Sequence, residues 1–339
     1  MVNDLPENRE DILRQIPAVS FKERVEEICS EKPDIVFICV PSDSVIEVLT
    51  RVAPLVEAGT IITDVAGVKQ PVLDAAKKIV PEGVLFVGGH PMAGSEKSGV
   101  EAAQPFLFQN AVYVLSPLKD YPVNSISPLI DAIEHLGGRI LFIDAARHDK
   151  IAAATSHLPQ LLAVELVNLL GELSDGDERF NTLAAGGFRD MTRIASSDFR
   201  VWQDVIAANR KNIDALLTAF IARLSGLDKS LKNGEDNKIA KEFESARYAR
   251  SRIRRGGKGF LHPLYDLYVV VEDKVGVLRE ITTTLADAGV NIKDIELLKV
   301  REGTGGMFRI SFETEQILDL SAQILRGRGL QILRKEFEG

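Results

Sequence analysis

The sequence predicts an α/β chain built from a doubly wound sheet, an all-helical domain and a small βαββαβ module. Short apolar runs alternate with helical segments as far as residue 143. Helical periodicity then dominates to about residue 260, and strand patterns return after it. We therefore predict three domains, at residues 1–143, 144–260 and 261–339.

The composition is that of a globular protein with an acidic surface. Of 339 residues, 45% are hydrophobic, and the formal net charge is −8. This charge argues against nucleic acid and anionic membranes as partners, and no apolar run is long enough for a membrane span. Two cysteines, Cys29 and Cys39, are too few for a disulfide framework or a structural zinc site. We expect a reducing, cytoplasmic compartment and no metal site.

The first domain alternates buried strands with helices. Residues 1–34 are polar and predict two short helices, at 9–15 and 22–29. Apolar runs predict five strands, at 35–40, 60–65, 84–87, 111–115 and 139–143. Helices between them are expected at 42–56, 71–79 and 126–136. This alternation favours a doubly wound sheet with crossover helices.

The usual opening of a dinucleotide-binding sheet is missing. Such a sheet begins with a strand, a glycine-rich turn and a helix whose N-terminus holds the pyrophosphate. Here the first glycine is Gly59, and the later glycine clusters at 256–259 and 303–306 do not join a strand to a helix of this sheet. We expect a Rossmann-like domain that is N-terminally incomplete and lacks its first β-α-β unit.

His90 is the candidate general base. It follows the predicted strand at 84–87, and Gly88 and Gly89 precede it. We expect these glycines to free the backbone for a loop, while Pro91 biases His90 towards an extended conformation. A histidine past the carboxyl end of such a strand suits a catalytic site. The alternative is an ordinary loop histidine.

The helical domain carries two further candidate stretches. Asp144 should cap a helix to about residue 170, and Pro159 should kink it beside His157. Arg189 and Arg193 are i,i+4 neighbours that a substrate carboxylate could bridge. His157 could instead be a buried structural residue, and the arginines could belong to a surface salt-bridge cluster. From Ser197 or Asp198, one long amphipathic helix should run to about residue 224.

The last part of the chain reads as a linker followed by a ferredoxin-like module. Residues 226–262 are polar, charged and finally glycine-rich, as in a helix that leads into a linker. Strands are then expected at 266–271, 290–300, 307–313 and 331–333, with helices at 277–288 and 317–325.

Four motifs together resemble the prephenate dehydrogenase family, whose members act in tyrosine biosynthesis. They are residues 64–69, 90–96, 156–159 and 192–195, in that order. The resemblance covers roughly residues 35–260. Residues 266–334 resemble an ACT domain through 273–278 and 288–292.

The resemblance implies a function and a set of sites. The reaction would be oxidative decarboxylation of prephenate, with hydride transfer to NAD or possibly NADP, by a homodimer that tyrosine inhibits through the ACT domain. His90 would accept the proton of the substrate hydroxyl, and Arg193 would bind a carboxylate. The substrate pocket would include His157, Arg189, Gly186 and Glu96. The cofactor would lie near Val40, Pro41, Asp64 and Gly67, and the regulatory ligand near Asp273, Gly276, Asn291 and Ile292.

The sequence departs from the family pattern in two places. Many members carry a serine where this chain has Gly67, and the glycine-rich loop is absent. Two alternatives therefore stand beside the prephenate reading. One is an arogenate dehydrogenase, whose substrate differs only in an amino group on the side chain. The other is a non-catalytic amino-acid-sensing subunit with a degenerate cofactor site.

Overall fold

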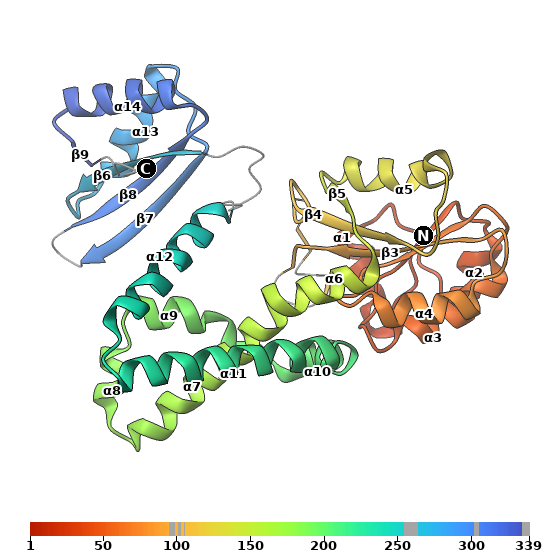
Figure 1. Cartoon of the computed structure of the whole chain (residues 1–339). Coiled ribbons are helices and arrows are strands. Elements are labelled where there is room, and N and C mark those ends of the chain that lie inside the picture. The colour runs from red at the N-terminus through yellow and green to blue at the C-terminus, as the bar shows by residue number, and fades with distance from the viewer. Residues whose placement is uncertain (95–98, 101–102, 105, 254–263, 302–304, 334–339) are drawn as a thin grey trace. The chain divides into compact units, whose positions relative to one another are not determined.

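The computed structural model describes residues 1–94, 99–100, 103–104, 106–253, 264–301 and 305–333 (Figure 1). The chain divides into two compact units, Met1–Phe243 and Glu244–Gly339. The finer division at residues 143 and 260 stays a prediction.

The first unit contains a five-stranded sheet in the order β1-β2-β3-β4-β5. Its strands are β1 (Ile35–Ile38), β2 (Ile61–Asp64), β3 (Leu85–Pro91), β4 (Val112–Pro117) and β5 (Arg139–Phe142). The first three strands are parallel, as crossover helices require, but β4 is antiparallel to β3, and β5 is parallel to β4. The described sheet thus mixes parallel and antiparallel pairs.

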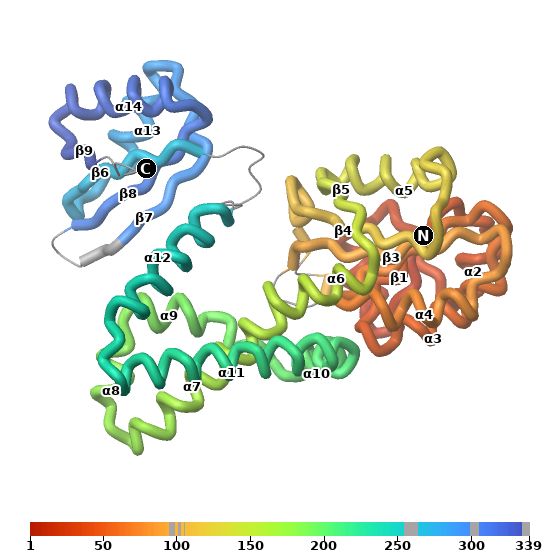
Figure 2. The backbone as a smooth tube through the Cα atoms, in the orientation of Figure 1, coloured from red at the N-terminus to blue at the C-terminus, as the bar shows by residue number. Residues whose placement is uncertain are grey.

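Helices cover both faces of this sheet (Figure 2). On one face, α2 (Val25–Ser30), α3 (Val45–Val52) and α4 (Gln70–Ile79) bury Cys29, Leu49 and Leu73 against β1 and β2. On the other face, α5 (Val123–His135) buries Ile126, Leu129 and Ile133 against Val87 and Leu115. The predicted Rossmann-like sheet with helices packed against it is confirmed.

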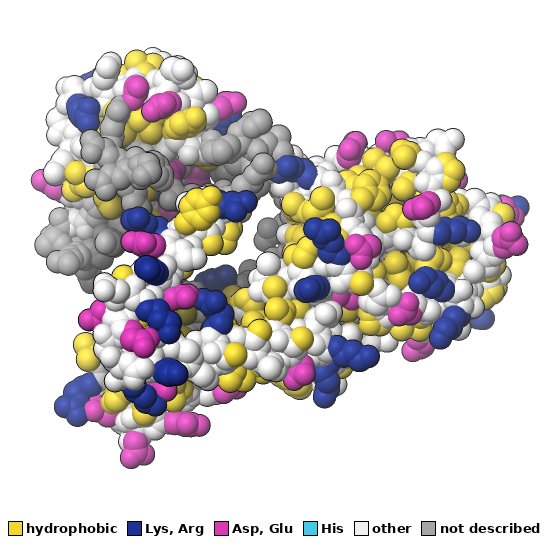
Figure 3. All heavy atoms as spheres, in the orientation of Figure 1, with side chains coloured by type: hydrophobic (Ala, Val, Ile, Leu, Met, Phe, Trp, Pro, Cys, Tyr) yellow, Lys and Arg dark blue, Asp and Glu magenta, His cyan; other side chains and the backbone are white. Residues whose placement is uncertain are grey.

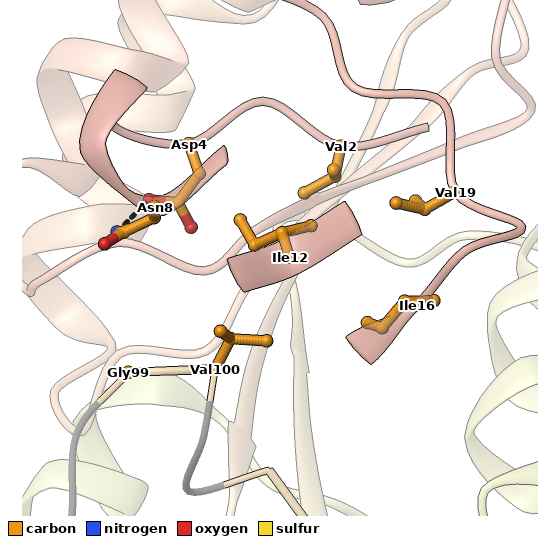
Figure 4. Close-up of a pocket in the computed structure, with 8 residues that line it drawn as sticks. All are labelled: Val2, Asp4, Asn8, Ile12, Ile16, Val19, Gly99 and Val100. Carbon is orange, nitrogen blue, oxygen red and sulfur yellow. Dashed lines mark hydrogen bonds between the residues drawn. The ribbon is translucent and has the colours of Figure 1, made fainter. Parts of the chain in front are cut away.

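Residues 1–34 form η1 (Pro6–Asn8), α1 (Arg9–Gln15) and α2, with one isolated parallel bridge between Val2 and Phe21. A cavity of about 370 Å³ lies between α1 and residues 99–100. Ile12 of α1 and Ile16, which follows that helix, line the cavity with Val2, Val19 and Val100 (Figure 4). Two lining residues are polar, Asp4 and Asn8, and they hydrogen-bond to each other. The other lining residues are apolar side chains and Gly99.

Strand β3 is longer than predicted and contains His90, which pairs with Val114 of β4. The expectation of a loop after residue 87 is wrong. Gly88 and Gly89 serve close packing: a Cβ on Gly89 would lie 2.4 Å from the Asp64 carbonyl oxygen, and one on Gly88 would lie 2.7 Å from Leu73 Cδ1. Glycine here permits neighbouring elements to approach the strand, which sequence alone does not distinguish from loop formation.

The helices after the sheet follow the predicted capping signals in part. They are α6 (Ala145–Ala152), the π-helical turn η4 (Ala153–His157), α7 (Leu158–Ser174), α8 (Glu178–Leu183), α9 (Gly186–Thr192), η5 (Arg193–Ser196), α10 (Phe199–Ala208), α11 (Arg210–Lys232) and α12 (Asp236–Arg252). Asp144 and Asp198 cap α6 and α10. The predicted interruption before Pro159 takes the form of the π turn.

The single helix predicted from residue 198 to about 224 is instead two helices that meet at Asn209. The Asn209 side chain is buried, and its amide donates to the Asp149 carbonyl oxygen at 2.8 Å. A buried amide must find partners, and this bond fixes the chain at the junction of α10 and α11.

The second unit contains the predicted βαββαβ module. Its elements are β6 (Tyr265–Val271), α13 (Val277–Asp287), β7 (Asp294–Arg301), β8 (Gly305–Phe312), α14 (Glu315–Gly327) and β9 (Gln331–Leu333). The antiparallel sheet has the order β7-β8-β6-β9, and its core includes Leu267, Ile281 and Phe312. Among the helices of the described residues, none has the length and apolarity needed to cross a membrane.

Candidate active site

His90 lies at the edge of the sheet where the parallel strands β1, β2 and β3 have their carboxyl ends. Val40 and Pro41 follow β1, and Gly67 follows β2. A Cβ on Gly67 would lie 3.8 Å from His90 Nε2, so these two residues are neighbours. Ligands of open α/β sheets bind at this edge, and the predicted placement of His90 at such a position is therefore consistent with the fold.

A buried ion pair supports the strand under His90. Lys69 and Asp64 are fully buried and paired, and Lys69 Nζ also donates to the Gly89 carbonyl oxygen at 2.6 Å. Asp64 accepts from the backbone N–H groups of Ala66 at 3.0 Å and Gly89 at 3.2 Å. The pair thus joins the end of β2, the start of α4 and the residue before His90.

Two residues of α6 that the sequence analysis did not single out lie behind His90: His148 contacts its ring, and Asp149 contacts His148. His90 Nδ1 lies 2.8 Å from His148 Nε2, and His148 Nδ1 lies 2.8 Å from Asp149 Oδ1. His148 and Asp149 are buried, with 3% and 2% of their surface exposed. The available signal was weak: on the predicted helix, His148 shares a face with Ala145 and Ala152.

His90 is neutral over the physiological pH range. Burial is the main cause, and repulsion from His148 and Lys69 adds to it; together they lower the pKa of His90 from 6.5 to about 3. Burial also lowers the pKa of His157, against the attraction of Asp149. A neutral imidazole has a free lone pair, so His90 has the protonation state that a general base needs.

His157 lies in the π turn and is buried beside Trp202. Its Nδ1 is 3.1 Å from Asn209 Nδ2, and the rings of His157 and Trp202 meet edge to face with centroids 6.1 Å apart. π turns widen a helix and often occur at functional sites. Asn209 is a third residue that sequence reasoning missed; it interrupts the apolar stripe of the predicted long helix.

The remaining predicted substrate residues lie on exposed turns of the helical region. Arg193 begins η5, and Gly186 and Arg189 belong to α9. Gln160, three residues after His157, donates from Nε2 to the Ile194 carbonyl oxygen at 3.0 Å, which ties the turn that carries Arg193 to α7. Glu96 lies outside the described residues.

The predicted cofactor residues divide into two groups. Val40, Pro41 and Gly67 lie just beyond the strand ends, where a ligand could reach them. The Asp64 carboxylate is instead fully buried and bound by Lys69, Ala66 and Gly89, so the geometry does not support the predicted contact between Asp64 and a cofactor.

The four predicted regulatory residues lie at two opposite ends of α13. Asp273 and Gly276 line a cavity of about 230 Å³ at the start of α13, together with Val271, Leu278, Leu297 and Phe308. Asn291 and Ile292 follow the opposite end of that helix. An 11-residue helix is about 16 Å long, so one copy of the module does not bring the four residues together.

Three family models match the chain. They are the nucleotide-binding domain of prephenate dehydrogenase over residues 18–142, its dimerization domain over 144–245, and the ACT domain over 265–323. The chain is 33% identical over 294 residues to the prephenate dehydrogenase of Bacillus subtilis (strain 168), a match that covers 86% of this chain and 79% of that protein.

Two dehydrogenases are among the solved structures that have a similar fold. The prephenate dehydrogenase from A. aeolicus in complex with hydroxyphenyl propionate and NAD+ superposes with a TM-score of 0.68 and 25% identity, covering 74% of this chain and 88% of that one. The Synechocystis arogenate dehydrogenase superposes with a TM-score of 0.66 and 25% identity, covering 75% and 90%. With the family models matching most of its length and the Bacillus protein one-third identical, the chain belongs to the prephenate dehydrogenase family.

Proposed function

We propose that this chain oxidises and decarboxylates prephenate to 4-hydroxyphenylpyruvate, with His90 as the general base. The observation that carries the proposal is the neutral His90 imidazole beside Gly67, at the edge of the sheet where family members are expected to hold their ligands. NAD, when bound, accepts the hydride that leaves the hydroxyl-bearing ring carbon; NADP is the alternative acceptor.

The proposal assigns residues of the chain to the hydroxyl proton and to one substrate carboxylate. His90 Nε2 takes the hydroxyl proton while the carbonyl forms, and loss of the ring carboxylate as CO₂ makes the ring aromatic. The phenol oxygen then regains a proton, so the histidine returns to its neutral state. In this proposal Arg193 binds a substrate carboxylate through charge-assisted hydrogen bonds, and His157 lines the pocket.

The residues at the strand ends fit the nicotinamide half of the cofactor better than its adenosine half. Gly67 leaves open space beside His90, and Val40 and Pro41 continue the same edge. The pyrophosphate, however, normally rests on a glycine turn, and residues 1–58 contain no glycine. Assays should therefore use NAD at millimolar concentration.

The test is turnover of prephenate, followed as reduced cofactor at equal concentrations of NAD and NADP. Prephenate-dependent reduction that His90→Asn abolishes is the expected result. Arogenate must be assayed in parallel, because the Synechocystis arogenate dehydrogenase matches this fold almost as well as the A. aeolicus prephenate dehydrogenase. A higher kcat/KM for arogenate would reassign the substrate, and no turnover of either would favour the amino-acid-sensing subunit.

The proposal extends to assembly and regulation. Leu173, Leu183 and Val201 of the helical region are exposed, which supports dimerisation through these helices. Figure 3 shows hydrophobic side chains on the surface of this region. The cavity at Asp273 and Gly276 supports tyrosine as a feedback ligand. Calorimetric titration of the whole chain with tyrosine, and with phenylalanine for comparison, tests the binding of the feedback ligand.

The two cysteines, Cys29 and Cys39, are both unpaired, which supports a cytoplasmic location.

A further inference from the structure

Asp149 is a point of convergence between the helical region and the sheet. Its Oδ1 accepts from the Lys69 backbone N–H at 2.7 Å, and its Oδ2 accepts from the Gln70 backbone N–H at 2.9 Å. Oδ1 also contacts His148 Nδ1 at 2.8 Å. Asp149 is 2% exposed, and its carboxylate uses both oxygens to accept from backbone N–H groups at the start of α4.

The donors and acceptors along this chain of contacts can be assigned from chemistry. An ionised carboxylate only accepts hydrogen bonds, so His148 Nδ1 must be the donor to Asp149. A neutral His148 then has a bare Nε2, which accepts from His90 Nδ1. His90, being neutral as well, carries its lone pair at Nε2, the nitrogen that faces Gly67.

We propose that Asp149 and His148 are positioning residues that fix the tautomer of His90, so that its lone pair lies at Nε2, towards the ligand side of the sheet. The inference rests on the proposed function only in taking His90 as the base. The charged and titratable groups around His90 are His148 and Asp149 from α6, Lys69 at the start of α4, and His157 from the π turn. Only His148 hydrogen-bonds to the His90 ring in the described residues.

The direct test is the protonation pattern of the histidine nitrogens in the whole chain. Long-range ¹H–¹⁵N spectra of protein labelled at histidine nitrogens distinguish a protonated ring nitrogen from a bare one. We expect wild-type His90 and His148 each to carry a proton on Nδ1 and a bare Nε2. A His90 with its proton on Nε2, or an even mixture of tautomers, would overturn the proposal.

Two variants of similar side-chain length separate positioning from packing. His148→Gln keeps an oxygen that can accept from His90 Nδ1, whereas His148→Met does not. We expect the Gln variant to retain the Nδ1–H tautomer of His90 and a kcat within about fivefold of wild type. The Met variant should show mixed His90 tautomers and a kcat lower by roughly 10- to 100-fold, with KM within about twofold. Equal tautomers and equal kcat in both variants would contradict the proposal.

Asp149→Asn removes the acceptor that sets the donor and acceptor roles in the hydrogen bonds from Asp149 through His148 to His90. Loss of the carboxylate behind a catalytic imidazole lowers kcat by up to about 10⁴ in serine proteases. We expect a loss of at least about 10-fold here and a changed His148 tautomer. Since Asp149 also holds the start of α4, this variant could fail to fold, and the two His148 variants then decide the question. His135→Met is the matched control, because His135 is exposed on α5 and should change neither spectrum nor kcat.

The spectra also separate this inference from the proposed function. If wild-type protein turns over neither prephenate nor arogenate but shows the expected tautomers, the positioning inference stands and the proposed function fails. If it turns over substrate with His90 protonated on Nε2, the proposed reaction stands, but the inference and the role of His90 Nε2 as the base both fail.

Discussion

At the scale of single residues, the site depends on one imidazole that stays neutral. His90→Asn removes the proposed base while keeping a polar group of similar size, so we expect kcat to fall by a factor of about 10² or more with substrate affinity nearly unchanged. The measurement is steady-state turnover of prephenate, with His135→Asn as the control. Retention of more than a tenth of the wild-type kcat would show that His90 is not the base.

The depressed pKa of His90 also predicts an effect of acid on stability. His90 has a folded pKa of about 3 against 6.5 in the unfolded chain, so the unfolded state binds more protons between these values. Stability from this group is therefore fully present above pH 6.5 and is lost as the pH falls towards 3. Thermal midpoints should drop less on acidification in His90→Asn than in wild type. An identical pH dependence in both proteins would argue against the depressed pKa.

At Gly67 we predict a substitution that raises kcat instead of lowering it. A Cβ added there meets its nearest atoms at 3.8–3.9 Å, which is ordinary contact, so Gly67→Ser should fold with a thermal midpoint close to that of wild type. Its hydroxyl would lie near His90 Nε2, as the serine of other family members is expected to. We expect kcat to rise a few-fold. Gly67→Ala is the matched control, because it adds the Cβ without the hydroxyl and should leave kcat unchanged.

At the scale of elements, the Lys69–Asp64 pair joins β2, α4 and β3. Removing one partner of a buried pair leaves an uncompensated charge, so Lys69→Met should lower the free energy of unfolding by about 3–5 kcal/mol. Lys77→Met on the same helix breaks only an exposed pair with Asp74 and should cost less than about 1 kcal/mol. Chemical denaturation measures both.

A second substitution checks the mechanism of that loss. If the cost comes from the unpaired carboxylate, adding Asp64→Asn to Lys69→Met should restore part of the stability. A double variant that is less stable than Lys69→Met alone would indicate that packing of the lysine chain, rather than its charge, stabilises the junction.

The elements themselves were largely predictable, and the exceptions share a physical cause. Short apolar runs bounded by polar residues located β1, β2, β4 and β5, and the aspartates at 144 and 198 located helix starts. The errors at Gly88–Gly89 and at Asn209 both come from contacts with residues distant in sequence, such as Asp64 and Asp149. Local pattern carries no information about such contacts.

The same limit applies to the site. The motif around His90 is local and could be recognised. His148 and Asp149 could not, because their role depends on the contact between His148 and His90, which are 58 residues apart in sequence. On the sequence they are two polar residues within a helix. Asp64 shows the converse: a strand-end carboxylate was expected to face a ligand, whereas a lysine five residues away keeps it inside.

At the scale of the whole molecule, cofactor affinity should be weak. Residues 1–58 contain no glycine, so a polypeptide of residues 1–339 would offer the pyrophosphate none of the N–H donors of a glycine turn there, each worth about 1.5–3 kcal/mol to a charged group. We expect a dissociation constant for NAD of about 1 mM or higher. Nicotinamide mononucleotide is the informative control, since it should bind about as tightly as NAD if the adenosine half finds no site. Micromolar binding of NAD, with much weaker binding of the mononucleotide, would mean that residues 1–34 build a phosphate site.

The antiparallel pairing of β3 with β4 has a consequence for altering substrate preference. Because β4 runs the opposite way, its first residues, rather than its last, lie beside His90: Val112 accepts from Met92 N–H, and Tyr113 pairs with Pro91. A library of substitutions at 110–112 would therefore change the surroundings of the His90 strand end, whereas one at 118–122 would act at the opposite edge of the sheet. A chimera that takes the His90 strand from a relative should therefore also take the segment before β4 from that relative.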